Sequence, residues 1–124
     1  MPGVDKVPDR DPSHLTRQLG HDPEAKLLIL TADLLGMCHS SNVGVYESVR
    51  SGLATGASLM VPGPWAREAA ACYRGEPVGV HLTLNAEFDF YRWRPITQAP
   101  SLLDGEGGFP RTVEDRWDPA DIEE

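Results

Sequence analysis

Three short apolar runs, separated by two helical patterns, constrain the fold of this chain more than any other feature. Each run is short and nearly continuous, as in strands that are buried in a parallel sheet. Polar caps and glycines bound the helical patterns between them. The predicted strands are 26–31, 57–61 and 78–83, and the predicted helices are 40–51, capped by Ser40 or Ser41, and 65–74. Strands and helices that alternate with short connections predict an α/β fold with a parallel sheet and right-handed crossovers.

The segments outside this pattern have a different composition. Residues 1–25 carry four prolines among charged residues, which predicts a flexible N-terminal arm. Residues 86–111 are rich in aromatic residues, glycine and proline, and predict a long surface loop of the kind that shapes binding sites. Residues 119–124 look like the first turn of a helix. A length of 124 residues fits one small domain.

The charge balance and the two cysteines limit the partners and the compartment that we expect. The net charge is −8, and eight acidic residues fall within 104–124. An acidic surface repels phosphate backbones, so nucleic acid is not an expected partner. No apolar run is long enough to span a bilayer, and the polar start of the chain does not resemble a signal peptide. Cys38 and Cys72 suggest no disulfide framework, so we expect a cytoplasmic protein.

Two polar residues lie where the predicted strands end. Asp33 follows the first strand, and His81 lies near the end of the third. Active sites of parallel α/β folds form at this edge, so the pair could act around a metal-bound water. The alternatives are purely structural: Asp33 could be a turn or helix-capping residue, and His81 could be a hydrogen-bonded core residue. His39 lies six residues after Asp33 and could face the same cavity, or it could simply begin a helix.

The segment 87–94 mixes aromatic and charged side chains, with Glu87, Tyr91 and Trp93 as the candidate ligand contacts. Sugars present apolar faces together with many hydroxyl groups, which such a segment suits. A protein interface would suit it equally.

Residues 27–108 resemble the YdjC-like family, which includes chitooligosaccharide deacetylases. The order and spacing of four segments carry the resemblance more specifically than any one of them. The matching segments are 27–36 (LLILTADLLG), 55–61 (TGASLMV), 78–84 (VGVHLTL) and 100–108 (PSLLDGEGG).

The resemblance implies a distorted (β/α) barrel and the removal of acetyl groups from N-acetylated amino sugars with a divalent metal, magnesium or zinc. By similarity, Asp33 takes the place of the catalytic base and His81 that of a metal ligand. Residues 26–124 would then be the N-terminal part of the deacetylase domain.

The sequence also departs from the family pattern. The first motif usually reads Ala-Asp-Asp-Phe-Gly, and Leu34 stands where its metal-binding second Asp is expected. The later His-x-His segment, which supplies another ligand, is missing from these 124 residues. A barrel needs about 200 residues or more, so three strands make only part of one. We therefore expect weak metal binding that His39 could in part restore.

Two functional hypotheses follow from the resemblance. The chain is either a truncated or impaired carbohydrate deacetylase, or a non-catalytic relative that binds sugar or has a regulatory role. A three-stranded parallel sheet with exposed edges also predicts self-association into a homo-oligomer.

Overall fold

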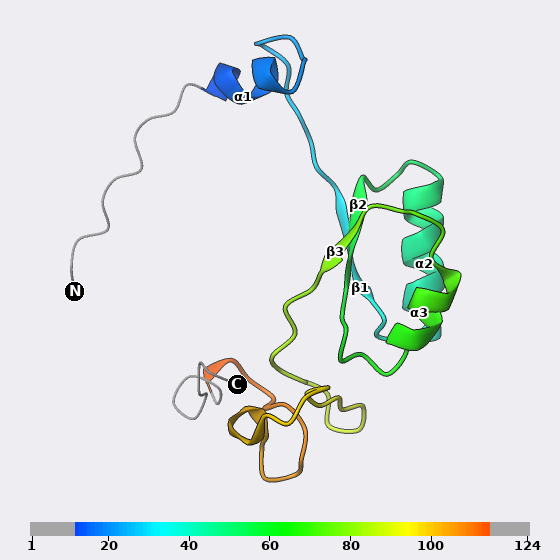
Figure 1. The fold of residues 1–124 in the computed structure, drawn as a ribbon, viewed down its shortest axis with the longest axis vertical. Helices are drawn as coiled ribbons and strands as arrows, with labels where there is room; N and C mark the ends of the chain where they lie inside the picture. The colour runs from blue at the N-terminus through cyan, green and yellow to red at the C-terminus, as the bar shows by residue number, and fades with distance from the viewer. Residues whose placement is uncertain (1–11, 115–124) are drawn as a thin grey trace, which may run out of the picture.

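The computed structural model describes residues 12–114, and these contain the predicted alternation of strands and helices. Three strands and two crossover helices form the centre of the molecule, with one short helix before them and a 3-10 turn after them (Figure 1). The elements are α1 (Pro12–Gln18), β1 (Thr31–Leu35), α2 (His39–Arg50), β2 (Gly56–Leu59), α3 (Ala66–Cys72), β3 (Val78–Val80) and η1 (Pro100–Leu102). The helical turn predicted at 119–124 lies outside the described residues.

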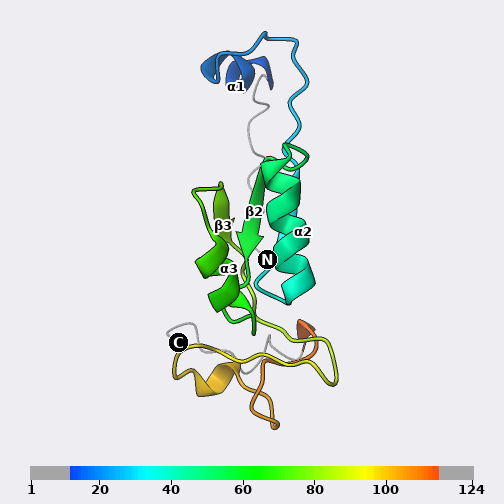
Figure 2. The same ribbon diagram turned by 90° about the vertical axis from the view of Figure 1, so that its right-hand side faces the viewer.

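The sheet is parallel and its strands follow chain order, β1-β2-β3. Both α2 and α3 lie on the same face of it, which Figure 2 shows from the helical side. Consecutive parallel strands with every crossover helix on one face are the repeating arrangement of a (β/α) barrel. The predicted fold class is therefore confirmed as part of such an architecture.

The core lies between the sheet and its two helices. Leu35 and Ala57 from the strands pack with Val45 and Tyr46 of α2 and with Ala69 of α3. The Tyr46 hydroxyl donates a 2.6 Å hydrogen bond to the Ala69 carbonyl, which ties the two helices together. No helix of residues 12–114 lies over the opposite face of the sheet (Figure 1).

A second apolar cluster forms beyond the C-terminal end of the sheet. Met60, just after β2, packs with Ala86, Trp93 and Phe109 from the segment that follows β3. Apart from η1, residues 86–111 have no regular helix or strand, so the predicted long loop is confirmed. Its small core holds the loop against the edge where the strands end (Figure 1).

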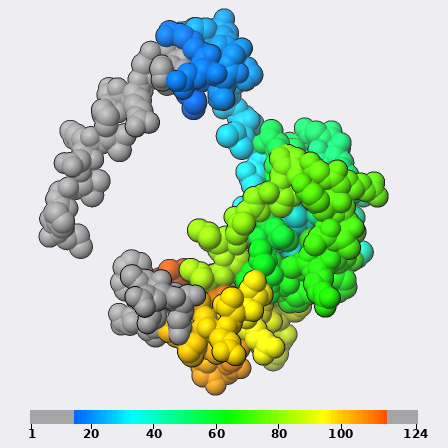
Figure 3. Space-filling view, viewed as in Figure 1, coloured from blue at the N-terminus to red at the C-terminus, as the bar shows by residue number. Residues whose placement is uncertain are grey.

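Two features of the N-terminal region differ from the predictions. The first strand begins at Thr31 rather than Lys26, and Leu28 and Ile29 are about four-fifths exposed, at 79% and 81%. A continuous apolar run predicts a strand that is buried on both faces. No segment among residues 12–114 buries the side chains of Leu28 and Ile29 in this way. The predicted arm contains helix α1, which stands apart from the sheet (Figure 3). The boundary between arm and domain stays a prediction.

Other boundaries moved by one or a few residues. Helix α2 begins at His39, and its cap is Cys38, not Ser40 or Ser41. Strand β3 ends at Val80, so His81 follows it and does not lie inside it. No helix in the described part of the chain is both long and apolar enough to cross a membrane.

Candidate active site at the C-terminal end of the sheet

A bulge in β1 positions Asp33. Ala32 pairs with Ala57 and Leu35 pairs with Leu59, so three steps along β1 face two steps along β2. The additional residue is accommodated by Leu34, whose φ of 66° lies in the left-handed region. Leucine adopts this conformation rarely, and bulges of this kind often lie beside active sites, where they redirect a side chain.

Ser58 joins Asp33 to His81. Its hydroxyl donates a 2.7 Å hydrogen bond to Oδ1 of Asp33. The same hydroxyl oxygen lies 2.9 Å from Nδ1 of His81. The predicted proximity of Asp33 and His81 is therefore confirmed, whereas their chemical roles stay predictions.

This hydrogen-bonded chain, Asp33–Ser58–His81, lies on the face of the sheet that the helices leave free. Ala57 and Leu59, on either side of Ser58, pack toward the helices, and side chains alternate along a strand. Asp33 is exposed, and Ser58 and His81 are half-buried. Sequence analysis missed Ser58, although a lone polar residue between two apolar neighbours in a strand is a signal for the opposite face.

His39 does not join this chain. Its Nδ1 lies 2.8 Å from Oε1 of Glu68 on α3, and its ring packs against Trp65 with centroids 5.8 Å apart. Glu68 also accepts a 2.7 Å hydrogen bond from the buried side chain of Asn42. The bonds from Asn42 and His39 hold the pKa of Glu68 below its ordinary value. The structure thus gives His39 a contact between the two helices, not the predicted place beside Asp33.

The three candidate sugar contacts are in different environments. Glu87 is exposed. The Tyr91 hydroxyl donates to the Met37 carbonyl, and burial raises the pKa of that hydroxyl. Trp93 is only 4% exposed, and its indole N–H donates to the Asn85 carbonyl. Packing accounts for Tyr91 and Trp93, so sugar binding by any of the three stays a prediction.

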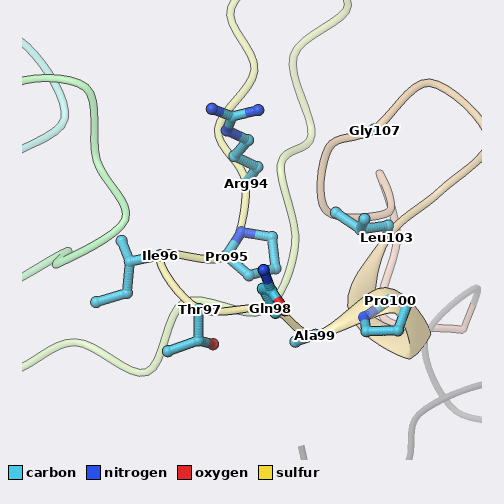
Figure 4. Close-up of a pocket in the computed structure, with 9 residues that line it drawn as sticks. All are labelled: Arg94, Pro95, Ile96, Thr97, Gln98, Ala99, Pro100, Leu103 and Gly107. Atoms are coloured by element: carbon cyan, nitrogen blue, oxygen red, sulfur yellow. The ribbon is translucent and has the colours of Figure 1, made fainter.

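Two hollows near the loop are separate from the Asp33–Ser58–His81 chain. One is lined by residues 94–100 with Leu103 and Gly107, as Figure 4 shows, and by none of the three site residues. The other lies between residues 37–38 and 88–91 and includes Cys38. Hydrogen bonds from Ser40 and Ser41 lower the pKa of the Cys38 thiol to about 7.

The described residues fit only part of a metal site. No group of three or more His, Cys, Asp or Glu side chains poised for a metal ion occurs among residues 12–114. Asp33 and His81 offer a carboxylate and an imidazole on one face, which are donor types that zinc and magnesium sites use. Catalytic zinc sites usually have three protein ligands. Asp33 and His81 therefore offer two of the three protein donors that such a site usually uses.

Comparisons with known proteins connect this geometry to a family. The model of the YdjC-like protein family matches residues 27–124. A carbohydrate deacetylase of Thermus thermophilus is 44% identical over 80% of this chain, and one of Geobacillus stearothermophilus is 35% identical over 69%. A chitooligosaccharide deacetylase of Yersinia pestis is 35% identical over 66%. These regions make up 34%, 34% and 31% of the relatives, so the chain spans about a third of their length.

A solved structure agrees with the sequence match. A crystal structure from Enterococcus faecalis, described as a cellobiose-phosphate cleavage protein, superposes with a TM-score of 0.61 and 26% sequence identity. The superposition covers 77% of this chain and 37% of the other. The residues that the family model matches, 27–124, contain the bulged β1, the Ser58 strand and the segment of His81. The chain belongs to the YdjC-like family.

Proposed function

We propose that this chain forms part of the active site of a metal-dependent carbohydrate deacetylase, which hydrolyses the acetamide group of N-acetylated amino sugars. The observation that carries the proposal is the Asp33–Ser58–His81 chain on the open face of the sheet. The names of the matched relatives, carbohydrate deacetylase and chitooligosaccharide deacetylase, support this substrate class.

Asp33 is the proposed base. Its carboxylate is exposed at the end of the sheet where parallel α/β folds bind substrates. It accepts a proton from a water molecule as the water oxygen bonds to the acetyl carbon. The amide C–N bond then breaks, acetate leaves, and the sugar amine takes up the proton.

His81 is the proposed metal ligand. A divalent metal, magnesium or zinc, would polarise the acetyl carbonyl and lower the pKa of the attacking water when it is bound. His81 is held through its main chain, because its N–H donates to the Leu59 carbonyl and its carbonyl accepts from the Thr83 hydroxyl. Its ring is therefore presented from a fixed point of the backbone.

We expect the activity of this chain by itself to be low. Leu34 has no lone pair to offer a cation, and His39 pairs with Glu68 instead. With His81 as the one proposed imidazole ligand, metal affinity should be well below that of a three-ligand site.

The test is acetate release from N-acetylglucosamine oligomers with added zinc or magnesium. We expect slow release by the wild-type chain and none by Asp33→Asn. Asp22→Asn is the matched control, because Asp22 makes a local turn contact with the backbone of Glu24 and lies far along the chain from the sheet. Absence of release by the wild type, or equal release by Asp33→Asn, would contradict the proposal.

A second candidate is a non-catalytic relative that binds sugar. The observation that favours it is Leu34 at the position of an expected ligand, together with the lack of a three-ligand group among residues 12–114. Calorimetric binding of an N-acetylglucosamine oligomer without any acetate release would support this candidate over the enzyme.

We also propose a cytoplasmic location. Both cysteines are free thiols, Cys38 half-buried and Cys72 exposed, and exposed free thiols suit a reducing compartment. Fractionation of cells that produce the protein would test this, and recovery in an extracellular fraction would contradict it.

A further inference from the structure

The Ser58 hydroxyl can donate only one hydrogen bond, and this determines which nitrogen of His81 carries a proton. A serine hydroxyl has one hydrogen, and a carboxylate can only accept. The hydrogen of Ser58 points to Oδ1 of Asp33, at 2.7 Å. Its oxygen must therefore accept at the other contact, 2.9 Å away, where Nδ1 of His81 is the donor.

We propose that Ser58 is a positioning residue, which holds His81 in the Nδ1–H tautomer and leaves the Nε2 lone pair free to bind a ligand. A hydrogen bond at one ring nitrogen of a histidine fixes the tautomer and so decides what the other nitrogen can do. Metal-bound histidines are usually oriented by such a partner. Here the partner is a serine hydroxyl that is itself oriented by Asp33.

The surroundings of Ser58 make its hydroxyl a fixed reference point. Ser58 lies in the central strand, paired to Gly79 of β3, and its neighbours Ala57 and Leu59 pack toward the helices. The main chain of His81 is held at both its N–H and its carbonyl. Because the backbone is fixed at both residues, the bond to Ser58 orients the imidazole ring.

The effect on metal binding rests on the proposed function, whereas the tautomer does not. Free histidine in water prefers the Nε2–H form, in which Nε2 has no lone pair for a metal. Loss of the Ser58 hydroxyl should therefore shift His81 toward the form that cannot bind a metal through Nε2. Removing the partner of a metal-bound histidine typically costs about 10- to 100-fold in metal affinity.

The direct test is the tautomer of His81, measured by long-range ¹H–¹⁵N NMR on the ¹⁵N-labelled chain at a pH where imidazoles are neutral. We expect a protonated Nδ1 in the wild type and a shift toward protonated Nε2 in Ser58→Ala. Ser58→Thr keeps a hydroxyl and suits a strand, so it should restore the wild-type spectrum. Ser48→Ala is the control, since the Ser48 hydroxyl bonds only within α2. A wild-type His81 with protonated Nε2, or no change in Ser58→Ala, would overturn the assignment.

Zinc binding by calorimetry tests the consequence. We expect affinity to fall about 10- to 100-fold in Ser58→Ala and to be kept in Ser58→Thr. Unchanged affinity in Ser58→Ala, with a changed tautomer, would refute the positioning role. If no form of the chain binds zinc while the tautomer responds as expected, the metal part of the proposed function fails and the tautomer assignment stands.

Discussion

Replacing Leu34 by aspartate tests whether the bulge of β1 is a metal-ligand position that this chain lacks. Leu34 follows the proposed base Asp33 and has a φ of 66°. Aspartate and asparagine adopt the left-handed region several-fold more readily than other residues with side chains. The two are nearly the same size, but only aspartate brings a charged ligand. Leu34→Asn is therefore the matched control for Leu34→Asp.

Two opposing effects set the metal-free stability of both variants. A left-handed conformation costs an ordinary residue about 1–2 kcal/mol, of which either substitution relieves about 1 kcal/mol. Leu34 is 41% exposed. Full burial of a leucine contributes about 1.5–3 kcal/mol, so roughly three-fifths of that value is lost. Because these effects nearly cancel, we expect both variants to unfold within about 1 kcal/mol of the wild type.

Zinc should separate the two variants. A ligand that binds only the folded state contributes about 2.7 kcal/mol at 100 times its Kd. For a chain of this size that corresponds to a rise in Tm of about 10 °C. We expect this rise for Leu34→Asp and a much smaller one for Leu34→Asn and the wild type, in thermal unfolding followed by circular dichroism with and without Zn²⁺. Equal zinc-induced shifts in the Asp and Asn variants would refute the reasoning.

Three further predictions concern the helical layer and the sheet edges. Asn42→Ala should lower the free energy of unfolding in urea by about 2–4 kcal/mol, because it leaves the buried N–H of Gly36 without its acceptor and removes the amide donor to the Trp65 carbonyl and to Oε2 of Glu68; a loss below about 1 kcal/mol would contradict this. The folded-state pKa of Glu68 is depressed from an ordinary value of 4.5, so its stabilising effect is present above that pH and is lost as the pH falls below it. The difference in stability between the wild type and Glu68→Gln should shrink over that range, and Glu47→Gln, exposed on α2, should show no such trend. The outer edges of β1 and β3 pair with no other strand of residues 12–114 and should cause self-association, so light scattering should give a mass above 13.6 kDa, and a monodisperse monomer would exclude it.

Local patterns predicted the elements of this fold, but not how far each is covered. The order of strands and helices was correct because apolar runs and caps are encoded within a few residues. The run at 26–31 misled because it indicates cover on both faces, and cover depends on segments far away in the chain. Cys38 caps α2 by accepting from the Ser41 N–H, a role that the serines beside it masked.

For the site, the sequence predicted which residues lie close together but not the residue that joins them. Asp33 and His81 were expected to be close because parallel strands end at a common edge, and this needs no knowledge of register. The role of Ser58 depends on register and on the bulge that turns Asp33 toward it, and neither can be read from the sequence. His39 was associated with Asp33 by their separation of six residues, but the first turn of α2 directs it toward Glu68.

The open face of the sheet links the proposed chemistry to the stability of this part of the fold. Among residues 12–114, no helix covers the face that carries Asp33, Ser58 and His81 (Figure 1). A base and a metal ligand act most strongly where water is excluded, because charges interact weakly in water. A segment or partner that covered this face would bury apolar surface and would also exclude water from the site. We therefore expect cover of this face to raise the stability of this part of the fold and the activity of the proposed site together.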